Sequence, residues 1–254
     1  MTGRTAGFAI LALALVGAAC TSSSQSTTTF STETPAETST TTPPAVSTAE
    51  QVYEQVAPSI ASIDTDIAGG SGILVDDSTV LTAAHVVWPY QSVRVVFPNG
   101  AEIRDAPVIG TDLFGDLALV DVSGVANVPA PVEIGDGEAI PLGRPVYLVG
   151  YPGESEAFPQ PTITEGILSR TREWESEAWT FLQSDTTVVG GQSGGALVDE
   201  DGMVIGITNF SFLEEFGLSG SLTDAATAIE RMRSGAPIGE LSNRLPPQIG
   251  RAHV

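Results

Sequence analysis

The stretch GGQSGGAL, from Gly190 to Leu197, places four glycines around one glutamine and one serine. A glycine in a strand costs backbone entropy and supplies no side chain for packing, so this run indicates a tight turn. Ser193 lies at its centre. Small neighbours admit another chain close to the hydroxyl, and a tight turn can aim backbone N–H groups at a developing oxyanion. The stretch is therefore typical of a nucleophilic serine for acyl transfer.

A nucleophilic serine needs a base to take its proton, and the base needs a third group to orient it. The chain has two histidines, and His253 is next to the C-terminal residue. His85 lies in LTAAHVV, at the end of a strand-like run. Alone it would more often be a structural histidine, but beside the serine turn it is the candidate base.

The orienting group should be an aspartate held near the histidine. Asp116, in LFGDLALVDV, stands just before an alternating apolar strand, so the core anchors one side of it. Asp112 is four residues earlier in a more loop-like segment and is the alternative. Asp121 falls on the strand itself, where alternation points it toward solvent. Asp116 is the preferred candidate.

Short strand-like segments follow one another along most of the chain, separated by Gly, Pro and Asp turns. They are SIASID, GGSGILVD, TVLTAAHVV, SVRVVF, AEIRDAPVIG, DLALVDV, PVYLVGYPG, PTITEGILSRTRE, WTFLQSD, GALVDEDG and MVIGITNF. The PNG between SVRVVF and AEIRDAPVIG is a hairpin signal. Helices are expected over residues 47–57, where Ser47 and Glu50 form a capping box, and over residues 223–233. The pattern predicts an all-β barrel or sandwich with a short helix at each end.

The N-terminal segment, residues 1–19, is predicted to be a signal peptide, with Arg4 before an apolar run too short for a membrane span. The run ends in VGAAC, which resembles the lipobox of bacterial lipoproteins, although Gly17 stands where such boxes most often carry leucine. We expect Cys20 to be lipidated; the alternative is ordinary secretory cleavage nearby. Residues 20–46 would then be the lipidated cysteine and a disordered Ser/Thr/Pro-rich tether, glycosylated or not.

The charge balance excludes some partners. There are 31 acidic residues and 10 basic ones, for a net charge of -21, so no basic patch for nucleic acid is visible. One cysteine permits no internal disulfide. No metal cluster, Walker loop or dinucleotide fingerprint is present, so neither a cofactor nor a metal is expected.

The motifs LTAAHVV, GDLALV and GGQSGGAL, in this order, resemble trypsin-like serine proteases of the chymotrypsin fold, and more closely the bacterial HtrA/Deg proteases. The segments VYEQVAPSIASI, YLVGYPG, TITEGILS, FLQSD and GMVIGITN extend the resemblance over about residues 50–234. It implies a protease domain over residues 47–234, made of two six-stranded antiparallel β-barrels with the active site between them. Residues 235–254 would be a C-terminal tail.

The resemblance also implies roles. Ser193 would attack the scissile carbonyl, His85 would act as general base, and Asp116 would hold the histidine tautomer. The N–H groups of Gly191 and Ser193 would form the oxyanion hole. The substrate pocket would include Thr187, Thr208 and Asn209. It suggests a small or aliphatic side chain at the cleaved residue, or an acidic one if both threonines donate hydrogen bonds.

Two departures from the pattern matter. Digestive relatives carry aspartate where this chain has Gln192, so activation should not depend on a freed N-terminus. The usual HtrA chain continues into a PDZ domain, and this sequence ends too soon for one. The resemblance therefore implies an exported, lipid-anchored serine endopeptidase acting on protein or peptide substrates, in quality control or regulated proteolysis. The regulator and the oligomeric state stay open, with a trimer suggested by the resemblance.

Two other functions fit the sequence less well. A protease-fold binding module or scaffold without turnover would need a distorted serine turn, and the complete set of triad residues argues against it. An esterase of the α/β-hydrolase class would carry serine, acid and histidine in that order along the chain, whereas here the histidine comes first.

Overall fold

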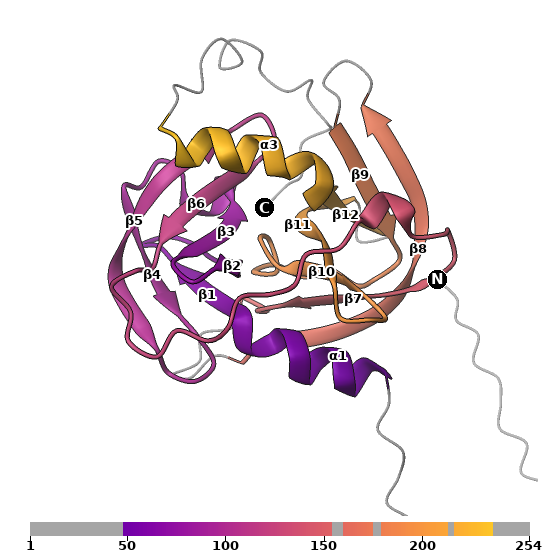
Figure 1. The fold of residues 1–254 in the computed structure, drawn as a ribbon, viewed down its shortest axis with the longest axis horizontal. Coiled ribbons are helices and arrows are strands. Elements are labelled where there is room, and N and C mark those ends of the chain that lie inside the picture. Colours follow the sequence, from indigo (N-terminus) through magenta and orange to yellow (C-terminus); the bar gives the residue numbers. More distant parts are fainter. Residues whose placement is uncertain (1–47, 154–159, 175–178, 213–215, 236–254) are drawn as a thin grey trace, which may run out of the picture. The chain divides into compact units, whose positions relative to one another are not determined.

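The computed structural model describes residues 48–153, 160–174, 179–212 and 216–235. Among these residues, strands are far more extensive than helices (Figure 1). The first six strands are β1 (Ile60–Asp64), β2 (Gly69–Asp76), β3 (Thr79–Ala83), β4 (Ser92–Val96), β5 (Glu102–Asp112) and β6 (Leu117–Asp121). The next six are β7 (Pro145–Gly150), β8 (Thr162–Trp174), β9 (Trp179–Ser184), β10 (Ala196–Asp199), β11 (Val204–Phe212) and β12 (Phe216–Ser221).

The strands form two closed barrels, and every pairing within them is antiparallel. The first barrel has the order β1–β2–β3–β6–β5–β4, and the second has the order β10–β11–β12–β9–β8–β7. The prediction of an all-β fold with two six-stranded antiparallel barrels is therefore confirmed. The PNG hairpin is confirmed as well, because β4 pairs with β5 and Gly100 adopts a φ of 84° in the turn between them.

Short helices flank and interrupt the barrels. They are α1 (Thr48–Val56), α2 (Ala84–Val87) and α3 (Leu222–Arg233), with 3-10 turns at Ala57–Ser59 and Gly137–Ala139. α1 and α3 match the predicted terminal helices, although Ser47 of the expected capping box lies outside the described residues. α2 differs from expectation: strand β3 ends at Ala83, and His85 lies in one turn of helix directly after it.

Strand β12, with the sequence FGLSGS, was not predicted from the apolar pattern. Its glycines and serines resemble turn residues, yet five of its six positions are buried. The reason is close packing: a Cβ on Gly220 would lie 3.2 Å from the Trp179 ring, and a Cβ on Gly217 would lie 2.8 Å from Val188. Small residues are needed here because neighbouring side chains occupy the space that a larger residue would fill.

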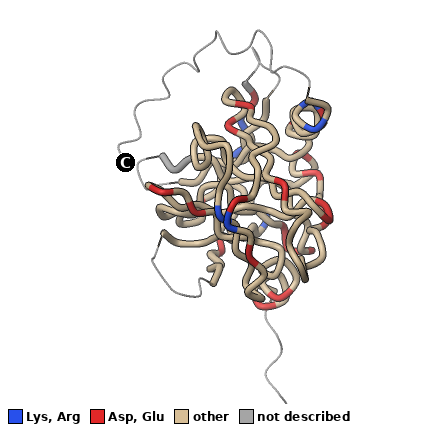
Figure 2. The backbone as a smooth tube through the Cα atoms, turned by 90° about the vertical axis from the view of Figure 1, so that its left-hand side faces the viewer, with Lys and Arg blue, Asp and Glu red and all other residues tan. Residues whose placement is uncertain are grey.

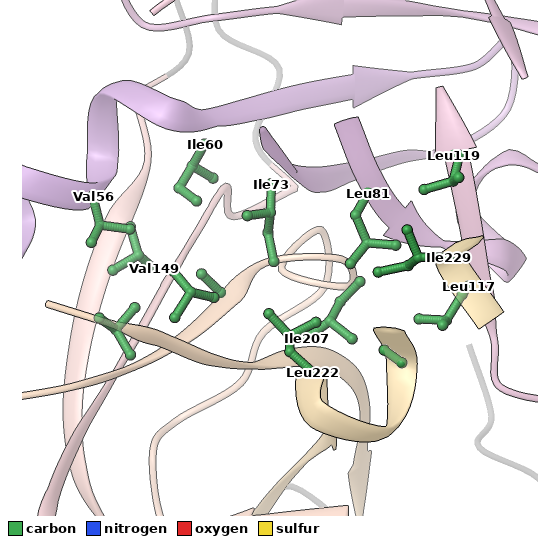
Figure 3. Packing of buried hydrophobic residues seen from close by; sticks show 14 of the residues in the cluster. Val56, Ile60, Ile73, Leu81, Leu117, Leu119, Val149, Ile207, Leu222 and Ile229 are labelled. Atoms are coloured by element: carbon green, nitrogen blue, oxygen red, sulfur yellow. The ribbon is translucent and has the colours of Figure 1, made fainter. Parts of the chain in front are cut away.

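The two barrels share one apolar cluster. Side chains of α1, α3 and both barrels meet in it, among them Val56, Ile73, Val149, Ile207 and Ile229 (Figure 3). Each fully buried Ile or Leu side chain contributes about 1.5–3 kcal/mol relative to an exposed one. This shared core fixes the position of one barrel relative to the other, so residues from different barrels can form one site.

Exposed ion pairs contribute little to the fold. Acidic positions outnumber basic ones along the chain (Figure 2). Arg94 pairs with Asp64 at 2.7 Å and with Glu102 at 3.0 Å, but these side chains are substantially exposed. Exposed pairs of this kind are worth about 0–1 kcal/mol. Within the described ranges, no helix has the length and apolar character needed to cross a membrane.

Candidate active site

Three hydrogen bonds join Asp116 to Ala84 and His85. The backbone N–H of Ala84 donates to the Asp116 carbonyl at 3.0 Å, and the backbone N–H of His85 donates to Asp116 Oδ1 at 2.9 Å. His85 Nδ1 lies 2.8 Å from Asp116 Oδ2. Since a carboxylate only accepts, Nδ1 carries the proton and the unprotonated nitrogen of the neutral ring is Nε2. That nitrogen is the one a general base would use.

Asp116 is held in an unusual backbone conformation. Its φ is 54°, in the left-handed region that non-glycine residues seldom adopt, and its side chain is only 12% exposed. Asn209 of the second barrel contributes to holding it, because Asn209 Nδ2 lies 3.2 Å from the Asp116 carbonyl and 3.3 Å from Oδ2. Backbone strain of this kind persists where surrounding contacts impose it, often at functional sites.

The alternative acid, Asp112, is placed elsewhere by the structure. It is buried, and its Oδ1 accepts hydrogen bonds from the backbone N–H groups of Phe114 at 3.0 Å and Gly115 at 3.2 Å. These bonds shape the turn that precedes Asp116. The structure therefore brings Asp116 to His85, while Asp112 supports the loop between β5 and β6.

The environment of His85 shifts its pKa. Burial by itself lowers the pKa of His85, but the hydrogen bond that His85 donates to Asp116 and the negative charge of that carboxylate outweigh burial. The pKa of His85 is therefore raised above its ordinary value. The histidine remains 45% exposed on its side chain, so solvent and a substrate can reach it.

The serine turn is shaped by glycines with positive φ. Gly191 has a φ of 92° and Gly194 a φ of 82°. The Gly190 carbonyl accepts a hydrogen bond from Gly153 N–H at 2.6 Å. A trans peptide is planar with C=O and N–H on opposite sides, so the Gly191 N–H points away from Gly153. Within the described residues, neither Gly191 N–H nor Ser193 N–H donates to a backbone carbonyl. These are the two donors expected to form the oxyanion hole.

The turn also requires glycine for lack of space. A Cβ on Gly191 would lie 2.3 Å from the Gly153 nitrogen, and a Cβ on Gly194 would lie 2.1 Å from the Ser71 carbonyl oxygen. Both neighbours are backbone atoms that cannot move aside. This explains the glycines of GGQSGGAL: at these two positions no other residue fits the conformation or the gap.

Gln192 closes the turn without a charge. Its side chain is buried, with Oε1 accepting from Val189 N–H at 2.8 Å and Nε2 donating to Thr162 Oγ1 at 3.1 Å. Its own N–H donates to the Val189 carbonyl at 3.2 Å. All of these partners belong to the body of the protein, so the turn is held without a salt bridge to a chain terminus.

The residues expected in the substrate pocket occupy different environments. Thr187 is exposed, whereas the Thr208 side chain is buried with its hydroxyl 3.4 Å from Ser219 Oγ. The Thr208 backbone also accepts from Gly194 N–H at 2.7 Å, which supports the serine turn. Asn209 was expected to contact substrate, but its amide faces Asp116, and its Oδ1 accepts from Gly220 N–H at 2.9 Å.

Sequence reasoning missed one residue at this site, Ser71 of β2. It is fully buried and contacts the serine turn through both its backbone and its hydroxyl. A signal was present, since Ser71 stands in GGSG and glycines flanking a polar residue in a strand mark a close backbone approach.

No cluster of His, Cys, Asp or Glu in the described part of the chain could hold a metal ion. Cys20 lies outside that part.

Two barrels, with a His–Asp pair on the first and a serine in a glycine-rich turn on the second, are the arrangement typical of trypsin-like serine peptidases. The family model described as a trypsin-like peptidase domain matches residues 70–207, and the chain belongs to this family. This range contains His85, Asp116 and Ser193.

Several relatives of this chain are named as HtrA or Do-like serine proteases. The Serine protease Do-like HtrA of Lactococcus lactis subsp. cremoris is 30% identical, with 68% of this chain and 43% of the relative covered. Serine protease PepD of Mycobacterium tuberculosis is 31% identical, with 63% and 38% covered. The chain thus spans less than half the length of these relatives.

The structural comparison agrees. An HtrA-type protease AlgW solved with a tripeptide gives a TM-score of 0.64 at 28% identity, covering 72% of this chain and 63% of that one. The serine endoprotease from Yersinia pestis gives a TM-score of 0.63 at 28% identity, covering 74% and 67%. The HtrA resemblance seen in the sequence is therefore confirmed by both relatives and solved structures.

Proposed function

We propose that this chain is a serine endopeptidase that cleaves peptide bonds with Ser193 as nucleophile, His85 as general base and Asp116 as the residue that orients the base. The observation that carries this proposal is the 2.8 Å contact between His85 Nδ1 and Asp116 Oδ2, which leaves Nε2 as the basic nitrogen. Family membership supports the same activity.

The proposed reaction has two steps, acylation and deacylation. In acylation, the Ser193 oxygen bonds to the scissile carbonyl carbon and its proton passes to His85 Nε2. The C–N bond then breaks, and His85 gives that proton to the leaving amine. In deacylation, water attacks the ester while His85 takes one proton from it, and the proton returns to the Ser193 oxygen as the ester C–O bond breaks. One peptide bond and one water thus yield an acid and an amine.

Each tetrahedral intermediate places a negative charge on the former carbonyl oxygen. The N–H groups of Gly191 and Ser193 are proposed to hold it, and Asp116 stabilises the imidazolium formed on His85. Asn209 holds the Asp116 carboxylate from the second barrel, so we assign it a positioning role. Gln192 holds the turn through uncharged contacts, so the site should be assembled before any cleavage of the chain.

The proposal is tested by labelling the full-length chain, purified in detergent, with a fluorophosphonate and locating the adduct by mass spectrometry. We expect covalent modification at Ser193 in wild type, none at residue 193 in Ser193→Ala, and strongly slowed labelling in His85→Ala. Labelling should need no prior proteolysis. A folded wild-type chain that is not labelled would refute the proposed activity and favour the binding-module alternative.

We also propose that the chain is exported and anchored to the outer face of the cytoplasmic membrane through lipidated Cys20, with residues 21–46 as a tether. By the resemblance to HtrA/Deg proteases, its role would be quality control or regulated proteolysis of protein substrates there. Mass spectrometry of the mature N-terminus should find Cys20 carrying a lipid mass, and Cys20→Ala should release the protein from membranes. A mature N-terminus beyond residue 20, without lipid, would contradict the anchoring.

A further inference from the structure

Ser71 links the first barrel to the serine turn of the second barrel. It lies on β2, is 0% exposed, and stands between Gly70 and Gly72. Its backbone N–H donates to the Ser193 carbonyl at 2.8 Å. Its hydroxyl donates to the Gly191 carbonyl at 2.9 Å. One buried residue therefore holds the nucleophile's own carbonyl and the carbonyl two residues before it.

The direction of the Ser71 hydroxyl proton follows from its neighbours. Tyr151 N–H, just after β7, lies 2.8 Å from the same oxygen, and an N–H can only donate. The hydroxyl must accept from Tyr151, so its single proton is free to be donated to the Gly191 carbonyl. The resulting relay runs from Tyr151 through Ser71 to Gly191, and removing the hydroxyl would leave the buried Tyr151 N–H and the Gly191 carbonyl without this partner.

The relay fixes the parts of the turn that catalysis needs. Ser193 N–H, one of the two oxyanion donors, lies in the chain between the Gly191 and Ser193 carbonyls. When both carbonyls are held by Ser71, the backbone between them has little freedom to rotate. Because Ser71 belongs to the barrel that carries His85, the same contacts also set the position of the nucleophile relative to its base.

Other contacts show that Ser71 is closely packed. Thr82 Oγ1 donates to the Ser71 carbonyl at 2.7 Å, which holds Ser71 within its own barrel. A Cβ on Gly150 would lie 3.1 Å from the Ser71 hydroxyl, and a Cβ on Gly194 would lie 2.1 Å from the Ser71 carbonyl. The hydroxyl is enclosed by backbone on both sides and does not reach the solvent where a substrate would bind.

We infer that Ser71 is a positioning residue for the oxyanion hole and the nucleophile, acting across the two barrels through its hydroxyl and its backbone N–H. This inference rests on the proposed function, because it assigns Ser71 to the oxyanion donors of Gly191 and Ser193. It predicts that loss of the hydroxyl slows the chemical step of labelling. Binding of the reagent and the pKa of His85 should stay unchanged.

The test compares Ser71→Ala with Ser59→Ala in the full chain. Ser59 is the matched control, since its buried hydroxyl also donates to a backbone carbonyl, that of Ala130 at 2.7 Å, away from the serine turn. In Ser71→Ala the saturating rate of fluorophosphonate labelling should fall about 10- to 100-fold, while the half-saturating concentration stays within about threefold of wild type. Ser59→Ala should change neither beyond about threefold.

The pH profile separates Ser71 from the triad. The inflection that reports His85 should stay where it is in Ser71→Ala, because the contacts between His85 and Asp116 are untouched. The inference is overturned if Ser71→Ala is labelled as fast as Ser59→Ala. It is also overturned if Ser71→Ala raises the half-saturating reagent concentration without lowering the saturating rate, or if the fraction of unfolded Ser71→Ala protein explains the lower rate.

Hydrogen exchange gives a readout that does not require activity. Amides of residues 189–195 should exchange faster in Ser71→Ala than in wild type, and Ser59→Ala should leave them unchanged. Equal exchange in all three proteins would overturn the inference. If wild type is not labelled but exchange in the turn still depends on Ser71, the proposed activity fails while the positioning role of Ser71 stands.

Discussion

Asp116→Asn is expected to lower the rate of fluorophosphonate labelling by about 10³- to 10⁴-fold while leaving the protein folded. Asp116 accepts hydrogen bonds at both oxygens: Oδ1 from His85 N–H, and Oδ2 from His85 Nδ1 and Asn209 Nδ2. An asparagine has only one oxygen. In one orientation of its amide the NH₂ group faces the His85 backbone N–H, and in the other it faces His85 Nδ1. An NH₂ group that faces Nδ1 would favour the histidine tautomer protonated on Nε2. That tautomer cannot accept the serine proton.

The same substitution should move the pH dependence of labelling. Only neutral His85 can act as base, so the rate falls as the pH drops below the pKa of His85. The hydrogen bond and charge of Asp116 raise that pKa. Without the charge, the pKa of His85 should fall, and the acidic limb of the remaining activity should shift to lower pH. An unchanged or upward-shifted limb would contradict the proposed pairing.

Asp112→Asn is the matched control. Asp112 uses one oxygen, Oδ1, for both of its backbone hydrogen bonds, and an asparagine oxygen can accept both. Labelling should stay within about threefold of wild type, with the acidic limb unmoved. The reverse outcome, a large loss in Asp112→Asn and a small one in Asp116→Asn, would restore Asp112 as the catalytic acid.

The local sequence pattern predicts eleven of the twelve strands but not the last one, and the closure of the strands into two barrels was expected only from the family resemblance. Eleven strands have apolar residues in runs or in alternation, and these patterns are set locally by which face is buried. In β12 the buried positions include Gly217 and Gly220, because Val188 and Trp179 fill the space beside them. That requirement comes from residues far along the chain, so no local pattern reveals it.

The candidate active site could also be predicted only in part from the sequence. Glycines around Ser193 signal a tight turn whatever surrounds them, and elimination leaves one plausible histidine. The choice between Asp112 and Asp116 depends on backbone conformation: only the positive φ of Asp116 turns its carboxylate toward α2. The roles of Asn209 and Ser71 depend on contacts between barrels. Such contacts join residues far apart in sequence, and spacing alone cannot show them.

Gly191→Ala is expected to lower the labelling rate by about 10²- to 10³-fold, the loss typical of removing one oxyanion donor. Its Cβ would lie 2.3 Å from the Gly153 nitrogen and 2.8 Å from the Tyr151 carbonyl oxygen, and a φ of 92° strains any residue with a side chain. The turn must rotate to relieve this. Rotation breaks the bond from Gly153 to the Gly190 carbonyl, and the N–H of residue 191 then leaves the oxyanion position.

Gly190→Ala is the control that makes this result specific to the donor. It changes the adjacent glycine of the same turn, but its Cβ meets no atom within 4 Å and its φ is not positive. Labelling should stay within about threefold of wild type. Gly191→Ala should also keep the His85 inflection in its pH profile, because the loss lies in the oxyanion hole and not in the base. Equal rates in the two variants would mean that the Gly191 N–H does not serve the oxyanion, and the Gly190–Ser193 turn would then need another role.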